Sequence, residues 1–299
     1  MQDHGYTVSD LQAKEKPKNS GLIIFNIPSM ENPFYSQIVR GAKSAADRHG
    51  YQMVINEEHI NDGTIARLTD LIRKVNAAGL ITTNHVSTQL LQKLKNEVPL
   101  VQCCEFDSSL DIPHVSIDDI AAAKNTMEYL LSLGRRNIAF INGPLRYKYA
   151  RHRLRGYLDS LEQAGIPEDP GLIIQLPEIN YDMAVSSVIQ LLNAGRRPDA
   201  FFCVSDVYAA AVIKACTRMG LNVPRDVMVS GFDNVNISFM TSPTITTVKQ
   251  PKFQLGFSSC ELLIQHIANP ESTVRSILLE TELIVRESTA SPVNAVAVP

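Results

Sequence analysis

Short apolar runs of strand length alternate with longer amphipathic stretches along most of this chain, and that alternation restricts its fold more than any other feature. Each run is apolar almost throughout, which is typical of a parallel strand covered by helices on both faces. Between the runs, apolar residues such as Phe34, Ile38, Ala42 and Ala45 recur at the spacing of one helix face. The sequence therefore predicts repeated βαβ units in a doubly wound α/β architecture.

The 299 residues are enough for about two domains. One series of strands and helices ends near residue 134, and a second begins with the strand at Ile138. A further helix pattern at Phe253–Ile267 and two short strands, Ser276–Leu279 and Glu282–Arg286, come after the second series and can return to the first domain. The expected division is 21–135 plus 249–271 for the N-terminal subdomain and 136–248 plus 272–290 for the C-terminal subdomain, with a hinge or linker at 1–20 and a tail at 291–299.

Charge and cysteine usage exclude several classes of protein. A net charge of −3 argues against a nucleic-acid surface over the bulk of the chain, because such surfaces are basic. The five cysteines show no CxxC pair or zinc spacing, and adjacent Cys103 and Cys104 would point to opposite faces of a strand. We expect free, mostly buried thiols and no metal site. Without a signal peptide or a membrane-length apolar run, we expect a cytoplasmic protein.

Catalytic motifs are absent from the sequence. It contains no GxGxxG, Walker loop, HExxH or GxSxG, and its seven histidines form no recognisable catalytic pairing with a serine or cysteine. We therefore expect no enzyme activity and no cofactor.

Ligands of open α/β sheets bind at the carboxyl ends of the strands, so the residues after each expected strand are the candidates for a site. Phe34 and Tyr35 begin a helix after the first strand and face either the crevice or the core. The basic run after Ile141 is either a solvated face or a source of one guanidinium for a polar ligand. Asp233 follows a strand and a glycine, where it can accept hydrogen bonds from ligand hydroxyls or form a turn.

Six segments of the chain occur in one order: GLIIFNIPSMENPFYSQIVRGAKSAADRHGY, VSIDDIAAAKNTMEYLLSLGRRNIAFINGP, RLRGYLDSLEQAGI, DAFFCVSDVYAAAVIKACTRMGLNVPRDVMVSGFDN, SPTITTVKQP and ELIVREST. Together they resemble the effector-binding core of lactose-repressor-type (LacI/GalR) transcription regulators over residues 21–289. The resemblance implies a periplasmic-binding-protein-like fold of type I, in which two doubly wound parallel-sheet domains are linked by about three crossovers. TTVKQP and RES favour the regulators over the alternative, a solute-binding protein of a sugar transport system.

The resemblance also assigns ligand-binding roles by motif. In RLRGY it makes Arg153 a clamp on polar groups, and in GFDN it makes Asp233 an acceptor of hydroxyl or ring N–H protons. It places the NPFY aromatics Phe34 and Tyr35 against the ligand. Phe202 is implied as a second aromatic wall and Gln250 as a further contact at a domain crossover.

Two departures from the family pattern concern the ligand. Ser205 and Asp206 can each cap the helix that follows. Where many relatives have Asn-Asp, Ser205 replaces a ligand-facing amide by a shorter hydroxyl; capping alone is the simpler reading for Asp206. Cys104 and Glu105 stand where sugar binders often have Asp-Arg, which makes Glu105 a candidate ligand contact. Because PLVQCCEFDSSLDIPHVSIDDIAAA and FCVSDV resemble the cytidine-repressor branch, the expected effector is either a sugar or a nucleoside.

The family carries a helix-turn-helix domain before this core, and the sequence starts near the end of that domain. Leu11 is the nearest match to the family's hinge leucine, which enters the DNA minor groove. Either the chain has been trimmed of the DNA-binding domain, as the start inside the motif suggests, or the protein is naturally a sensor without it. We expect a homodimer that senses a small-molecule effector, contacts operator DNA only through that domain and does not contact a membrane.

Overall fold

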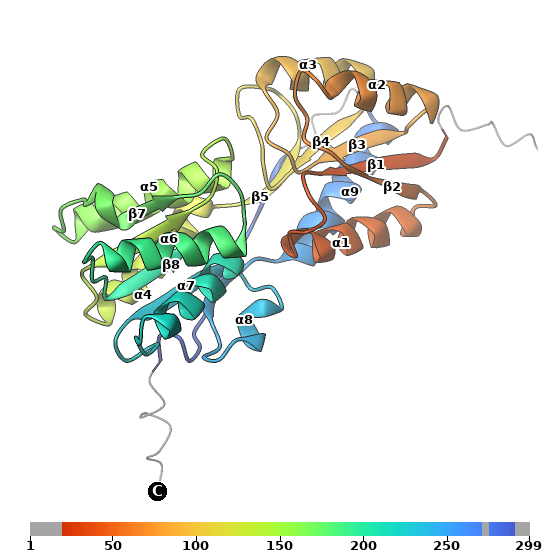
Figure 1. Cartoon of the computed structure of the whole chain (residues 1–299). Coiled ribbons are helices and arrows are strands. Elements are labelled where there is room, and N and C mark those ends of the chain that lie inside the picture. Colours follow the sequence, from red (N-terminus) through yellow and green to blue (C-terminus); the bar gives the residue numbers. More distant parts are fainter. Residues whose placement is uncertain (1–19, 271–274, 291–299) are drawn as a thin grey trace, which may run out of the picture.

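The computed structural model describes residues 20–270 and 275–290, which form two lobes that lie side by side (Figure 1). Each lobe contains a six-stranded sheet, with strand orders β11-β5-β4-β3-β1-β2 and β12-β10-β9-β8-β6-β7. Every pairing is parallel except that of β10 with β12. The predicted fold class, two doubly wound parallel-sheet domains, is confirmed.

Helices cover both faces of the first sheet: α1 and α9 pack on one face and α2 and α3 lie on the other (Figure 1). The elements of this lobe are β1 (Leu22–Ile27), α1 (Phe34–Arg48), β2 (Gln52–Glu57), α2 (Ile65–Lys74), β3 (Gly79–Thr82), α3 (Thr88–Glu97), β4 (Leu100–Cys103), β5 (His114–Ile117), α9 (Lys252–Ala268) and β11 (Ile277–Leu279).

The second sheet has the same two-sided cover, with α4 packed against α5 and α6 packed against α7. Its elements are α4 (Asp119–Ser132), β6 (Ile138–Asn142), α5 (Lys148–Gln163), the short 3-10 helix Pro170–Leu172, β7 (Ile173–Gln175), α6 (Tyr181–Asn193), β8 (Ala200–Cys203), α7 (Asp206–Arg218), β9 (Met228–Asp233), α8 (Ile237–Met240), β10 (Thr246–Lys249) and β12 (Glu282–Ile284).

Within the described ranges, the chain crosses between the lobes three times: after β5, after β10 and between β11 and β12. The expected subdomain division is therefore wrong at two places. Helix α4, assigned to the first subdomain, packs on α5 of the second, because the chain leaves the first lobe after strand β5. Strand β11, assigned to the second subdomain, pairs with β5 of the first. The linker at 1–20, apart from its last residue, and the tail at 291–299 lie outside the described residues.

All five cysteines are free thiols, as predicted, and Cys104 alone is partly exposed. The expectation that Cys103 and Cys104 point to opposite faces of a strand is wrong: β4 ends at Cys103, Cys104 has a φ of 69°, and the two Sγ atoms lie 3.7 Å apart. None of the helices within 20–270 and 275–290 is both long and apolar enough to cross a membrane.

Helices α1 and α9 approach so closely that their main chains touch through two glycines. A Cβ atom on Gly256 would lie 1.8 Å from the main-chain oxygen of Ile38, and one on Gly41 would lie 1.9 Å from that of Phe253. Both distances are far below any real carbon–oxygen contact, so only glycine allows this approach.

We expect Gly256→Ala to lower the free energy of unfolding by about 2 to 3 kcal/mol, because the helices must move apart and their packing is lost. Helix propensity alone predicts the opposite sign, since alanine is better than glycine by about 1 kcal/mol in a helix interior. Urea unfolding measures the difference, with Gln265→Ala on the exposed face of α9 as the control. A Gly256→Ala protein as stable as the wild type would contradict this packing.

Candidate functional site

A cavity of about 1140 Å³, including its open mouth, lies between the two lobes. It is lined by residues at the carboxyl ends of strands from both sheets, where open α/β sheets bind their ligands. Seven of the eight predicted site residues line it: Phe34, Tyr35, Glu105, Arg153, Ser205, Asp233 and Gln250. The structure therefore brings together side chains from positions more than 200 residues apart.

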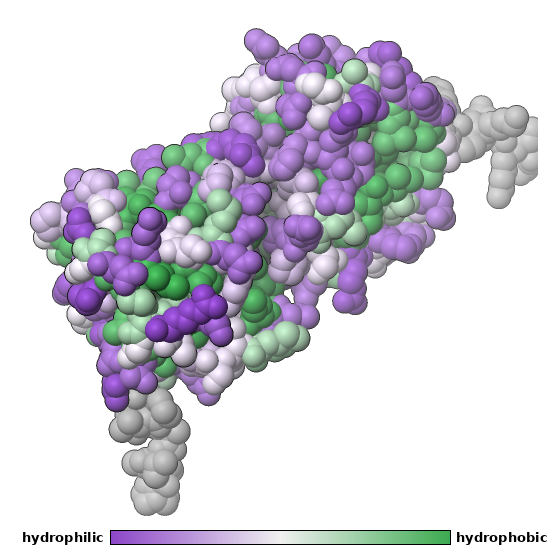
Figure 2. Space-filling view, in the orientation of Figure 1, coloured by the Kyte–Doolittle hydropathy of each residue, from purple (hydrophilic) through white to green (hydrophobic). Residues whose placement is uncertain are grey.

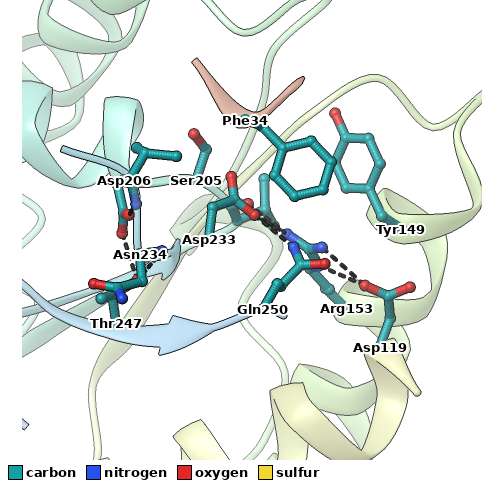
Figure 3. Close-up of polar contacts among 12 residues, drawn as sticks. Phe34, Asp119, Tyr149, Arg153, Ser205, Asp206, Asp233, Asn234, Thr247 and Gln250 are labelled. Atoms are coloured by element: carbon teal, nitrogen blue, oxygen red, sulfur yellow. Dashed lines mark hydrogen bonds and ion pairs between the residues drawn. The ribbon is translucent and has the colours of Figure 1, made fainter. Parts of the chain in front are cut away.

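Arg153 is the centre of the polar network (Figure 3). Its Nε and Nη2 donate to Oδ1 of Asp119 at 2.9 and 2.8 Å, and its Nη1 donates to the main-chain oxygen of Val204 at 2.7 Å. The guanidinium carbon lies 3.4 Å from the ring centre of Phe232, and Nη1 lies 3.7 Å from Asp233. These contacts fix the guanidinium plane, which sequence reasoning could not orient.

Asp233 shares this network from the other side. Gln250, at the crossover after β10, donates its side-chain N–H to Oδ1 of Asp233 at 2.7 Å. Burial raises the pKa of Asp233 to about 6, while Arg153, Lys252 and the Gln250 hydrogen bond limit the rise. A carboxylate held this way keeps lone pairs available for hydroxyl or N–H donors of a ligand.

All the buried charged side chains within the described ranges lie at or beside this cavity: Glu105, Asp119, Lys148, Arg153, Asp206, Asp233 and Lys252. The Lys148 ammonium contacts Asp119 at 2.6 Å, and the Lys252 ammonium donates to the main-chain oxygens of Asp233 and Asn234. Although burial alone raises the pKa of Asp119, Arg153 and Lys148 bring it below its usual value. Each buried cation therefore already has an acceptor within the protein.

Asp206 is a buried carboxyl group that forms no ion pair within the described residues; the charge of Lys252 lowers its pKa, but less than burial and Asp233 raise it. The Thr247 hydroxyl lies 2.5 Å from its Oδ1, and the Val235 main-chain N–H donates to its Oδ2 at 2.8 Å. Burial and the neighbouring Asp233 raise its pKa to about 8, so it is mostly protonated at pH 7. With Asp206 neutral, three carboxylates balance three cations around the cavity.

We expect Asp206→Asn to be more stable than the wild type near neutral pH, because the amide reproduces the protonated carboxyl group. Folding raises the pKa of Asp206. Its contribution to the free energy of unfolding is therefore most favourable below the unfolded pKa near 4, and it is lost as the pH rises towards 8. Over that interval the free energy of unfolding of the wild type falls by up to about 1.4 kcal/mol per pH unit relative to that of the variant. Urea unfolding at pH 5 and pH 7 measures the change, with Asp62→Asn in an exposed loop as the control; parallel pH profiles would contradict it.

Aromatic rings line the cavity on both sides. Phe34 and Tyr35 come from the start of α1, while Tyr147 and Tyr149 come from the start of α5. Figure 3 shows the Phe34 and Tyr149 rings near the group formed by Arg153, Asp233 and Gln250. The two tyrosines were missed because the run around them was interpreted only by its positive charges. Their position in the segment that follows strand β6 was the signal that could have identified them.

The prediction that Phe202 forms an aromatic wall is wrong. Its side chain has no exposed surface and packs edge-on against Phe140 in the core, with 5.2 Å between the ring centres. Both faces of strand β8 are covered, so Phe202, the third of its four residues, is buried. The aromatic surface on the second lobe is instead supplied by Tyr147 and Tyr149.

Ser205 combines both of its expected roles. Its hydroxyl accepts from the Val207 N–H at 3.2 Å as the cap of α7, and the residue also lines the cavity. Glu105 also lines the cavity, but its carboxylate oxygens accept from two main-chain N–H groups at the start of α5. Burial raises the pKa of Glu105, and the Lys148 ammonium and these N–H groups oppose the rise.

Strained backbone gathers at the same place. Cys104, Asp233 and Asn234 have φ values of 69°, 105° and 52°, and they are three of the four non-glycine residues with positive φ in the described ranges. All three follow or end a central strand at the edge that borders the cavity. Such conformations cost about 1–3 kcal/mol each and are concentrated at functional sites in proteins.

Among the described residues, no group of three or more His, Cys, Asp or Glu side chains could hold a metal ion. The cavity offers a fixed guanidinium, a carboxylate, amide donors and aromatic rings, which are groups that can bind a polar ligand.

The family of periplasmic binding protein-like domains matches residues 127–289. The HTH-type transcriptional repressor CytR of Escherichia coli is 30% identical over 287 residues, which cover 95% of this chain and 84% of that protein. A crystal structure of an uncharacterized protein from Actinobacillus succinogenes is 34% identical, with a TM-score of 0.83 over 91% of this chain and all of that one. A LacI family transcriptional regulator from Enterococcus faecium, solved with bound ribose, is 26% identical with a TM-score of 0.79, over 90% of this chain and 98% of that one.

Proposed function

Because this chain belongs to the LacI/GalR family of transcription regulators, we propose that its interlobe cavity binds a small uncharged effector, a sugar or a nucleoside. Arg153, Asp233, Gln250 and Ser205 supply its polar contacts, and Phe34, Tyr35, Tyr147 and Tyr149 supply the aromatic ones. Binding changes how operator DNA is held by a helix-turn-helix domain. These roles place the protein in the cytoplasm. The relatives are regulators rather than enzymes, as predicted for this chain.

The balance of buried charges carries the proposal. Three buried cations and three buried carboxylates surround the cavity once Asp206 is protonated, and each cation has an acceptor within the protein. A phosphate would enter without a buried partner, and the cost of removing it from water would not be recovered. Hydroxyl and ring N–H groups can instead use the remaining lone pairs of Asp233 and the donors of Gln250 and Arg153. Arg146 also lines the cavity, but its side chain is exposed and lies over the Tyr147 ring.

Two relatives bear on the choice of ligand. The Enterococcus faecium regulator was solved with ribose, and another, the transcriptional regulator CelR, was solved with cellobiose. Both ligands are neutral polyhydroxyl compounds, which is the chemistry that the charge balance favours here. Aromatic rings on both sides also suit the apolar face of a sugar or the ring of a nucleobase.

A thermal-shift screen tests this function. The panel contains neutral sugars, nucleosides and their phosphorylated counterparts, because a ligand that binds only the folded state raises the melting temperature. We expect at least one neutral compound to stabilise the chain more than its phosphate ester does. Stabilisation by the phosphate esters alone would contradict the proposed ligand class, and turnover of a hit would contradict a sensor.

We also propose that the chain forms a homodimer, as a regulator of a two-fold symmetric operator requires. Large apolar side chains are exposed on both lobes, among them Met240 at 72%, Leu278 at 62% and Phe253 at 44%. Figure 2 shows hydrophobic residues gathered on the first lobe, over the side where β2 and α1 lie in Figure 1. Sedimentation velocity at micromolar concentration is expected to give a dimer of this chain, and a clean monomer would contradict that assembly.

A further inference from the structure

Helix α5 starts at the cavity without a cap of its own. Its N-cap residue, Tyr147, makes no side-chain hydrogen bond to the first turn, where N–H groups have no partner within the helix. The carboxylate of Glu105 fills this role: Oε2 accepts from the Lys148 N–H at 2.6 Å and Oε1 accepts from the Tyr149 N–H at 3.1 Å. A carboxylate in this position is also favoured by the helix dipole.

The cap comes from the other lobe. Glu105 follows β4 of the first sheet, whereas α5 packs on the second, and the glutamate side chain is nearly inaccessible, at 5% exposure. Two neighbouring contacts also join the first lobe to the start of α5. The Phe106 ring of the first lobe lies 4.9 Å from the Lys148 ammonium, and Nδ1 of His59 lies 3.4 Å from the Tyr147 hydroxyl. Three residues of the first lobe thus hold three consecutive residues at the start of α5.

We infer that Glu105 is a positioning residue that fastens the two lobes together by capping α5 across the cavity, and that it is not a contact for the ligand. Both carboxylate oxygens are engaged by main-chain N–H groups, which satisfy this buried acid without a donor from a ligand. The inference concerns the same cavity as the proposed function, and it rests on that function only for the consequence to ligand affinity.

The consequence follows from what α5 carries. Tyr149 lies in its first turn and Arg153 one turn further on, and both line the cavity opposite Phe34. When the lobes separate, these groups move away from Phe34 and the site is no longer complete. The fraction of molecules with closed lobes multiplies the apparent affinity for an effector, so weakening the cap lowers affinity without removing a ligand contact.

Amide hydrogen exchange and small-angle X-ray scattering on the 299-residue chain test the inference without any ligand. In Glu105→Ala we expect the Lys148 and Tyr149 amides to exchange about tenfold faster than in the wild type, in line with the loss of a helix cap. We also expect a larger radius of gyration with an unchanged circular dichroism spectrum. Glu105→Gln keeps one acceptor oxygen and should recover part of both effects, which a general loss of stability would not do.

Glu128→Gln, on the exposed side of α4, removes one negative charge outside the cavity and should match the wild type in both measurements. Wild-type amide exchange or wild-type scattering in Glu105→Ala would overturn the positioning role. A Glu105→Gln protein that behaves like Glu105→Ala would also overturn it, because the acceptor oxygen would then have no effect. Failure of every sugar and nucleoside to bind contradicts the proposed function alone, since the exchange and scattering results decide the role of Glu105.

Discussion

Arg153→Met is expected to destabilise the protein by about 3 to 5 kcal/mol, the usual cost of removing one partner from a buried ion pair. The variant leaves Asp119 with Lys148 alone and takes the nearest guanidinium away from Asp233. It also exposes the main-chain oxygen of Val204 and the face of Phe232 to an unfilled space. Urea unfolding with circular dichroism measures the loss.

A second substitution separates the effect of Arg153 on stability from its effect on effector affinity. Arg153→Met leaves three buried carboxylates against two buried cations. Adding Asp119→Asn restores that balance, so the double variant should recover part of the lost stability. It should not recover effector affinity, because the guanidinium donor is still missing. Arg153→Lys is also expected to lose effector affinity. One ammonium group cannot supply the several donors and the flat stacking surface of a guanidinium. A stable Arg153→Met protein would contradict the network described here.

Asp233→Ala is expected to weaken effector binding by about 2 to 4 kcal/mol, or about 30- to 1000-fold in Kd. The carboxylate is the buried acceptor at the cavity with lone pairs left for a ligand, and its loss also frees the Gln250 amide that it holds. Because burial raises the pKa of Asp233 to about 6, its charge opposes folding above that pH. The variant should therefore not be severely unstable at neutral pH.

Isothermal titration calorimetry with the strongest hit of the thermal-shift screen measures this effect. Asp62→Asn, in an exposed loop of the first lobe, is the control for a general charge effect. Unchanged affinity in a folded Asp233→Ala protein would show that the effector binds elsewhere.

The strand pattern could be predicted because buried parallel strands consist of short, continuous runs of apolar residues. The predicted strand at Ile138, for example, is β6, and the apolar run in GLIIFN is β1. The boundary between the lobes could not be predicted in the same way. Helix α4 continues the alternation without a break in composition, and only its packing on α5 shows that it belongs to the second lobe.

Site residues could be predicted where a local motif determines their position. They could not be predicted where their role depends on contact between two separate elements. Arg153, Asp233 and Phe34 follow motifs, and the structure places them at one cavity. Asp119 was missed because its role depends on α5 lying against α4. The contact of Glu105 with the start of α5 could not be predicted, because nothing local shows that this helix end lies beside it. Phe202 was misplaced because sequence does not reveal how deeply a strand end is covered.

A crystal structure of the chain with the neutral sugar or nucleoside that raises its melting temperature most is the most direct test of the central claim. We predict that the compound lies between Phe34 and Tyr149, with hydrogen bonds to Arg153 and Asp233 and with the Glu105 carboxylate still on the main-chain N–H groups of α5. A ligand bound outside the interlobe cavity would contradict the account.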